Sequence, residues 1–123
     1  MEALIATMLL SLVPHEPAAG AERFACDMTA LTKSERAHHQ RLARTLLVAV
    51  EERRELSNGY AFRLPPRTLM SAAEWISRER RCCPFFTFEL EVPRDAGPLW
   101  LRVTGSEGVK AFIRAEFQLD STP

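Results

Sequence analysis

Several motifs that would identify a function directly are missing from this chain. It has three cysteines but no C-x-x-C pair, which excludes a zinc ribbon and a thioredoxin-type redox motif. It also lacks the G-x-S-x-G and H-E-x-x-H motifs of hydrolases. The stretch "TGSEGVK" (residues 104–110) begins like a phosphate-binding loop but lacks the spacing and the Ser or Thr after the lysine. None of these catalytic or nucleotide-binding classes is indicated.

The chain has no excess of charge of either sign. Lys plus Arg and Asp plus Glu both number 16, so the formal net charge is zero. Broad electrostatic binding to nucleic acid needs a basic surface that displaces counterions, and this composition does not provide one. We therefore expect no nucleic-acid partner, although Arg78, Arg80 and Arg81 form a local basic cluster.

No run of apolar residues is long enough to cross a membrane. The stretch "ALIATMLLSLV" near the start falls well short of the roughly 20 residues that a spanning helix needs. Ala19-Gly20-Ala21 is similar to a signal-peptide cleavage site, but Glu2 and the lack of Lys or Arg before the apolar stretch argue against a signal peptide. We expect residues 1–21 to form an apolar N-terminal helix and a linker, with no membrane partner.

Cysteine is too scarce here for a disulfide framework. An odd count of three leaves at least one free thiol, which is typical of a reducing compartment. We therefore expect a cytoplasmic protein whose 123 residues form one domain that can bury a core without structural metal or disulfides.

The hydrophobic pattern predicts an α+β fold. Expected are strands near residues 24–28, 60–64, 86–92 and 99–103, and helices near 34–53, 71–82 and 107–117. Capping-box patterns at Thr32–Glu35 and Ser71–Glu74 mark two helix starts, and Pro84 marks a helix end. The economical arrangement is a two-layer sandwich, a mainly antiparallel sheet of about four strands with helices on one face. The expected order is β-α-β-α-β-β-α over residues 22–119, with an N-terminal helix before it and a tail at 120–123.

The stretch "RERRCCPFF" carries the chemistry that remains. Glu79 shares one stripe of the second long helix with Ala72, Ile76 and Cys83. A carboxylate on an apolar stripe is costly unless it is paired or binds something. Either an arginine from a neighbouring strand, Arg63 or Arg102, neutralises Glu79, or Glu79 is a base or ligand beside two thiols.

Cys82 and Cys83 are adjacent, and neighbouring cysteines rarely form a disulfide with each other because the geometry strains the peptide between them. A bend at Pro84 would let both sulfurs meet one ion, and Cys26 could be a third sulfur. Three thiolates suit mercuric ion, arsenite, copper(I), or zinc with a fourth ligand. His38 is the candidate fourth ligand, since 38, 42, 46 and 49 share a helix face, although the pair at 38 and 39 also reads as a surface pair. The alternative is that the three cysteines only fill the core.

The segments "ERRCCPFFTFELEV" and "LWLRVTGSEGVKAFI" resemble a family of small bacterial proteins with an E-x-x-CCPF core. Similar segments occur as C-terminal extensions of some mercury-responsive regulators of the MerR type. The likeness spans about three quarters of the chain, from Cys26 to Phe117, and includes "GYAFRL" at residues 59–64. The helix-turn-helix half of those regulators is missing. The resemblance implies a functional cluster of Cys26, Glu79, Cys82 and Cys83.

Three interpretations follow, in order of preference. The first is a thiol module that binds a soft metal or metalloid ion (zinc, mercuric ion or arsenite) through Cys26, Cys82 and Cys83, with Glu79 as a base. The second is a structural or homodimerising domain with core cysteines. The third is an enzyme with a cysteine nucleophile and Glu79 or His38 as base, whose substrate the sequence does not indicate.

Overall fold

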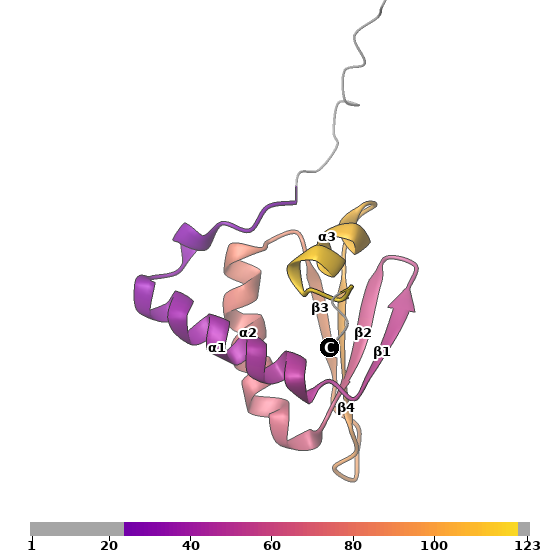
Figure 1. The fold of residues 1–123 in the computed structure, drawn as a ribbon. Helices are drawn as coiled ribbons and strands as arrows, with labels where there is room; N and C mark the ends of the chain where they lie inside the picture. Colours follow the sequence, from indigo (N-terminus) through magenta and orange to yellow (C-terminus); the bar gives the residue numbers. More distant parts are fainter. Residues whose placement is uncertain (1–23, 121–123) are drawn as a thin grey trace, which may run out of the picture.

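The computed structural model describes residues 24–120. Its elements, in chain order, are η1 (Met28–Ala30), α1 (Lys33–Ala49), β1 (Glu52–Leu56), β2 (Gly59–Leu64), η2 (Pro66–Thr68), α2 (Leu69–Cys82), β3 (Thr87–Glu91), β4 (Leu99–Thr104) and α3 (Val109–Glu116). The four strands form one antiparallel sheet in the order β1-β2-β4-β3. Figure 1 shows α1, α2 and α3 on one side of this sheet. The predicted α+β class with four antiparallel strands is confirmed.

The predicted element order is wrong at the first strand. Residues 24–28 were expected to be a strand, but residues 24–27 form no strand and Met28 begins η1. Their side chains do alternate between half-buried and exposed, as the sequence pattern indicated. The segment runs along the end of α2 instead of a strand, since the backbone N–H of Asp27 donates to the carbonyl of Cys82 at 2.7 Å.

A second correction concerns the fourth strand, which comes from a segment that was assigned to a helix. The first helix was expected to continue to about residue 53, but α1 ends at Ala49 and Glu52–Leu56 pairs with β2 as β1. The turn at residues 57–58 joins the two strands, and Gly59 begins β2. A Cβ atom at Gly59 would lie 2.0 Å from the carbonyl oxygen of Val103, so the close approach of β4 requires glycine here.

Alternate residues of the two central strands face the helices and form the core. Tyr60, Phe62 and Leu64 of β2 pair with Val103, Leu101 and Leu99 of β4, and all six are buried. The β3–β4 hairpin has the predicted antiparallel pairing. Trp75 of α2 packs edge-on against Phe88 of β3, and Phe117, directly after α3, packs against Phe62 and Trp75. The core therefore lies between the sheet and the three helices.

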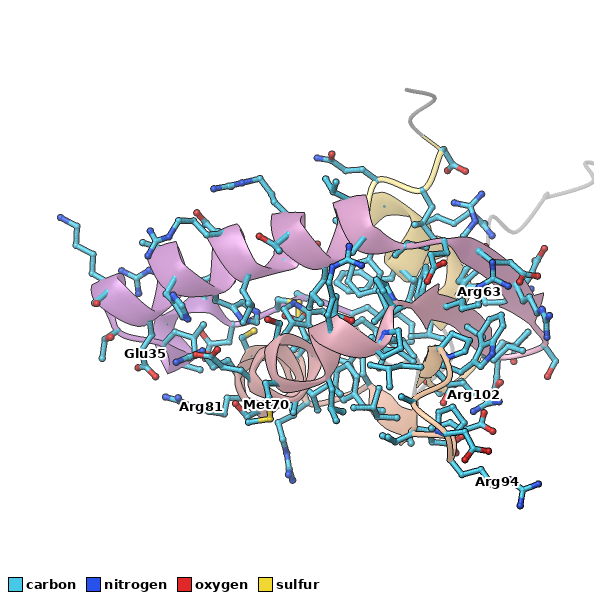
Figure 2. All side chains as sticks on the ribbon, turned by 90° about the horizontal axis from the view of Figure 1, so that it is seen from below. Glu35, Arg63, Met70, Arg81, Arg94 and Arg102 are labelled. Atoms are coloured by element: carbon cyan, nitrogen blue, oxygen red, sulfur yellow. A yellow bond between two sulfur atoms is a disulfide. The ribbon has the colours of Figure 1, made fainter. Side chains whose placement is uncertain are left out.

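The helix starts and ends are set by local chemistry. The capping box at α1 is confirmed, because the Thr32 hydroxyl accepts from the N–H of Glu35 and the Glu35 carboxylate accepts from the N–H of Thr32. The Glu35 carboxylate also binds Arg81 at the end of α2 (Figure 2). The second expected capping box, Ser71–Glu74, is wrong: α2 already begins at Leu69. It ends at Cys82, two residues before Pro84, as predicted.

The remaining expectations concern the ends of the chain. The predicted N-terminal helix and linker (1–21) and residues 121–123 of the tail lie outside the described residues. Within residues 24–120, no helix is both long enough and apolar enough to cross a membrane.

Candidate functional site

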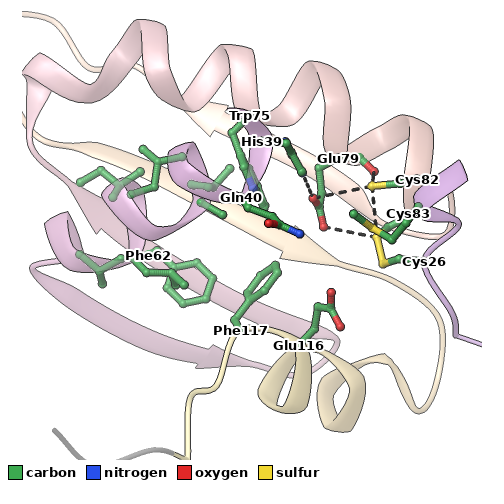
Figure 3. Close-up of a pocket in the computed structure, with 17 residues that line it drawn as sticks. Cys26, His39, Gln40, Phe62, Trp75, Glu79, Cys82, Cys83, Glu116 and Phe117 are labelled. Carbon is green, nitrogen blue, oxygen red and sulfur yellow. Dashed lines mark hydrogen bonds and ion pairs between the residues drawn. A yellow bond between two sulfur atoms is a disulfide. The ribbon is translucent and has the colours of Figure 1, made fainter. Parts of the chain in front are cut away.

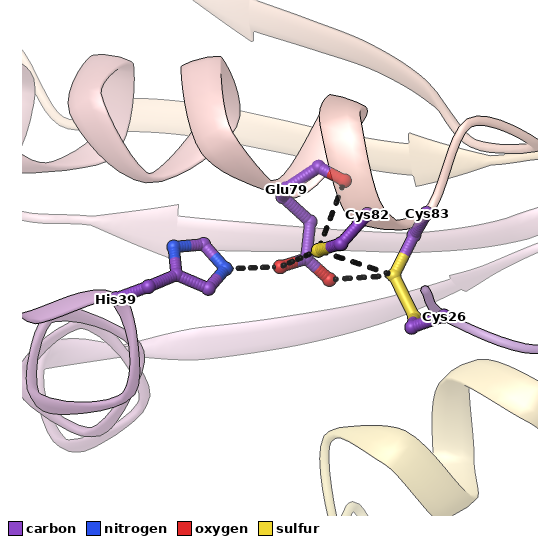
Figure 4. The surroundings of a disulfide bond; sticks show 5 residues. All are labelled: Cys26, His39, Glu79, Cys82 and Cys83. Atoms are coloured by element: carbon purple, nitrogen blue, oxygen red, sulfur yellow. Dashed lines mark hydrogen bonds and ion pairs between the residues drawn. A yellow bond between two sulfur atoms is a disulfide. The ribbon is translucent and has the colours of Figure 1, made fainter. Parts of the chain in front are cut away.

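Cys26 and Cys83 form a disulfide that joins the N-terminal segment to the end of α2 (Figure 4). Their Cα atoms lie 4.6 Å apart, although they are separated by 57 residues in the sequence. The hydrogen bond from Asp27 to the Cys82 carbonyl holds the same two segments together. The structure thus brings Cys26 to the adjacent cysteine pair, and the bridge uses Cys83.

Cys82 is the free cysteine of the described chain, and its sulfur lies next to the disulfide. The Sγ atom of Cys82 is 3.9 Å from the Sγ of Cys83, and the residue is only 1% exposed. Burial, followed by the negative charge of Glu79, raises the pKa of the Cys82 thiol to about 11. The thiol is therefore protonated at neutral pH, so a metal ion would have to displace its proton in order to bind.

Glu79, the carboxylate on the apolar stripe of α2, is paired with a histidine from α1. Its Oε2 atom lies 2.5 Å from Nε2 of His39, and both side chains are buried. A carboxylate only accepts, so the imidazole N–H donates. The expected arginine partners lie elsewhere: Arg63 binds Glu52 and Arg102 binds Glu91. Both arginines pair with glutamates of the sheet, so neither reaches α2.

The same carboxylate contacts the sulfurs. Oε1 of Glu79 is 3.3 Å from Sγ of Cys83, and Oε2 is 3.9 Å from Sγ of Cys82. While the disulfide is closed, Cys83 carries no proton to donate. Reduction would make it a thiol directed at Oε1, and Glu79 is then placed to accept the proton. Figure 4 shows the carboxylate between the imidazole and the sulfurs.

His38, the expected fourth ligand, lies outside this cluster. Its Nε2 atom is 2.9 Å from Oε1 of Glu74, and the side chain is 43% exposed. The buried histidine is His39, so the predicted surface pair at His38 and His39 is wrong for His39. The spacing of His39, Leu42 and Leu46 is a second way to draw the apolar stripe of α1, and all three are buried. Helical spacing was the signal that could have identified His39 as buried, but the same spacing also placed His38 on an apolar stripe.

His39 itself has one unused nitrogen. Its Nδ1 atom is buried and has no hydrogen-bond partner among residues 24–120. The ring stacks on Trp75, with centroids 6.2 Å apart and planes 7° from parallel. A buried polar atom without a partner is costly. The imidazole is therefore held in place by its bond to Glu79 and by the indole.

Two overlapping groups of donors have ligand atoms within 4.8 Å of one another: Cys26, Glu79 and Cys83, and His39, Glu79 and Cys82. Nitrogen and oxygen ligands on one tetrahedral zinc ion are about 3.3 Å apart, given bonds of about 2.0 Å. The 2.5 Å separation between His39 and Glu79 is too short for both atoms to bind one ion. It fits a histidine that orients a ligating or proton-accepting carboxylate.

A cavity of about 310 Å³ opens beside the cluster (Figure 3). Its wall includes the three cysteines, Glu79 and His39, and otherwise mostly apolar side chains from α1, α2, β2, β4 and the end of α3. Glu116 of α3 also lines it, and burial together with the charge of Glu79 raises the pKa of the Glu116 carboxyl. None of the residues described as lining the cavity is Lys or Arg. The cavity therefore favours neutral or cationic species over anions.

The site arises from segments that are distant in sequence, and no similarity to a known protein assigns it a role. Comparison with protein-family models, with curated proteins and with solved structures finds no match to this chain. What the site can do therefore follows from its own donors: three sulfurs, one carboxylate between them and a buried histidine that fixes the carboxylate.

Proposed function

We propose that the reduced protein binds a soft metal or metalloid ion through the thiolates of Cys26, Cys82 and Cys83, with Glu79 as proton acceptor. The observation that carries this proposal is the convergence of three sulfurs from two distant segments on one carboxylate. Thiolates prefer thiophilic ions such as mercuric ion, arsenite and zinc. The MerR-type resemblance of the CCPF segment agrees with this choice and remains a prediction.

The spacing of the sulfurs supports the proposal. The Sγ atoms of Cys82 and Cys83 are 3.9 Å apart. Two thiolates on a tetrahedral zinc ion, with Zn–S bonds of about 2.3 Å, lie about 3.8 Å apart. This pair can therefore bind one ion with little movement. Cys26 is bonded to Cys83, so opening the disulfide releases its sulfur next to the same point.

The charge of the site supports it as well. Each bound thiolate must lose a proton, and the Cys82 thiol holds its proton strongly because it is buried beside Glu79. A cation reverses this effect, because it is attracted by the same carboxylate that disfavours a free thiolate. The carboxylates of Glu79 and Glu116 both face the cavity, so cation binding relieves their mutual repulsion.

Reduction is the step that makes the site competent. In the closed disulfide neither Cys26 nor Cys83 can act as a thiolate ligand, which leaves Cys82 alone. Reduction adds two electrons and two protons to the bridge and yields two thiols. We therefore propose that the site works in a reducing compartment such as the cytoplasm, and that oxidation switches it off.

Native mass spectrometry of the full chain tests the proposal. The protein is reduced with a phosphine, freed of reductant without air, and offered zinc, mercuric ion and arsenite separately; an oxidised sample receives the same ions. We expect one ion per reduced chain, with loss of two or three protons, and weak or no binding to the oxidised chain. Absence of any ion adduct on the reduced chain overturns the proposal.

Single variants locate the ligands. Cys26→Ser, Cys82→Ser and Cys83→Ser should each weaken binding by at least tenfold, with circular dichroism showing that each variant is folded. His38→Gln is the matched control for His39→Gln, since the two histidines are adjacent but only His39 contacts Glu79. Equal affinity in wild type and all three cysteine variants contradicts a thiolate site.

The second candidate function is structural, and the burial of the sulfurs favours it. Cys82 and Cys83 are 1% and 0% exposed and belong to the hydrophobic core, where a disulfide ties a peripheral segment to α2. In that case the cysteine variants lose stability while the reduced wild type holds no ion. The mass-spectrometric experiment separates the two functions.

A further inference from the structure

The cavity next to the sulfurs is larger than an ion requires. Its volume is about 310 Å³, whereas a single water molecule occupies about 30 Å³ in the liquid. Cavities that hold small organic ligands begin near 300 Å³. The wall thus leaves room for a small organic group in contact with the thiols.

The two ends of the cavity differ in chemistry. One end holds the sulfurs and Glu79; Phe62 and Phe117 lie away from the sulfurs (Figure 3). The rest of the wall is mainly aliphatic, contributed by Ala43, Leu46, Leu47, Val50, Leu64 and Leu101. A matching ligand has an apolar body and one soft, thiol-reactive end.

The charged side chains of the cavity wall further restrict the class of ligand. Glu79 and Glu116 line the cavity, and no Lys or Arg appears among its described lining residues. A ligand with a carboxylate or phosphate end would meet like charge with nothing to compensate it. The soft end is therefore neutral or positively charged once bound.

We infer that the site binds a trivalent arsenical that carries one small aryl or alkyl group, with arsenic on two of the thiols and the organic group in the cavity. This inference rests on the proposed function. A monosubstituted arsenic(III) uses two thiolates and directs its third substituent away from them, which matches a sulfur pair at the end of an apolar chamber.

The binding step is balanced without any change of oxidation state. An organoarsonous acid, R–As(OH)₂, meets two thiols of the reduced protein. Two S–H and two As–O bonds break, two As–S bonds form, and two water molecules leave; Glu79 takes up and passes on a proton during the exchange. The product is neutral, as the charges of the cavity require.

The test compares phenylarsonous and methylarsonous acids, which use the same two thiols and differ in the apolar group. Affinities for the reduced full chain are measured by titration of tryptophan fluorescence, since Trp75 lines the cavity. Dithiothreitol serves as the reference dithiol without a cavity. We expect the protein to prefer phenyl over methyl by at least ten times the preference of dithiothreitol.

Ala43→Phe fills the cavity from α1, and Val48→Phe is the matched control, because Val48 is on the same helix, 88% exposed and outside this cavity. Ala43→Phe should abolish the phenyl preference, whereas Val48→Phe should leave the phenyl preference unchanged. If Ala43→Phe does not fold, Leu47→Trp is the alternative cavity-filling variant, because Leu47 lines the cavity and is 40% exposed.

The outcomes separate the two claims. If arsenite binds but the phenyl preference equals that of dithiothreitol, or if the preference survives in the folded cavity-filling variant, the inference is overturned while the ion site stands. If no arsenical, zinc or mercuric ion binds the reduced chain, the proposed function fails and the inference fails with it.

Discussion

The Oε2 atom of Glu79 lies 2.5 Å from the Nε2 atom of His39, and the two side chains are only 8% and 5% exposed. This pair explains why a carboxylate can occupy the apolar stripe of α2 next to two sulfurs. It also joins α1 to α2 at the point where the site forms. Five residues closer to the start of α2, Glu74 pairs with His38 in the same way but near the surface.

The buried pair should contribute to stability far more than its exposed counterpart. His39→Ala leaves Glu79 buried without its partner, and we expect the free energy of unfolding to fall by about 3–5 kcal/mol. His38→Ala breaks the exposed pair and should cost less than about 1 kcal/mol. Urea denaturation of the two oxidised variants measures the difference. Equal destabilisation would contradict the assigned roles of the two histidines.

The disulfide should stabilise the oxidised protein substantially. It closes a loop of 57 residues in the unfolded chain, for which loop-closure entropy gives about 4 kcal/mol. Phosphine reduction should therefore lower the denaturation midpoint of the wild type. Cys82→Ser should retain this response to reductant, while Cys26→Ser should lose it. If Cys26→Ser still responds to the reductant, the disulfide does not join Cys26 to Cys83.

The Cys82 thiol should lose its proton only at a pH well above the usual range of a cysteine. Its pKa is raised from 9.0 to about 11, first by burial and then by Glu79. The folded state holds this proton more tightly than the unfolded state, so its contribution is intact below about pH 9 and is lost as pH rises through about 11. The ultraviolet absorbance of the Cys82 thiolate, recorded on the oxidised metal-free protein, should show a midpoint near 11. A midpoint at or below 9 in folded protein would contradict the burial argument.

The α1 cap should make stability sensitive to acid. The hydrogen bond from Arg81, followed by that from the Thr32 backbone, lowers the pKa of Glu35 from 4.5 to about 2. The contribution of this carboxylate is therefore present above about pH 4.5 and is lost as pH falls through about 2. In Glu35→Gln the decline of the unfolding free energy between these pH values should be shallower. Parallel pH profiles in urea denaturation would contradict the prediction.

The first position of β2, Gly59, should not accept a side chain. In Gly59→Ala the new Cβ would lie 2.0 Å from the Val103 carbonyl oxygen, so β4 must move, and we expect a loss of about 3 kcal/mol. Gly97→Ala is the control, because the closest contact of its Cβ would be the Pro93 side chain, at 3.1 Å. Thermal unfolding should separate the two variants by several degrees. Similar midpoints would rule out the close strand approach.

Much of the fold follows from local pattern. The alternation in residues 60–64 and 99–103 correctly predicts which side chains face the helices, and Pro84 correctly predicts the end of α2. The hydrophobic pattern mispredicted strands where the burial of a segment does not follow its pairing in the sheet. Residues 24–28 alternate in burial without a strand partner, and "ERREL" has no apolar alternation yet forms β1 because β2 offers it a free edge.

For the site, too, local pattern predicted some features and tertiary packing determined the others. The sequence by itself placed Glu79 and Cys83 on one stripe of a helix and identified the three cysteines as the residues of interest, because helical spacing is a local property. Only the tertiary structure decided that Cys26 meets Cys83, that His39 and not His38 partners Glu79, and that an apolar cavity adjoins them. Those outcomes depend on how segments tens of residues apart pack together, and no local pattern encodes that placement.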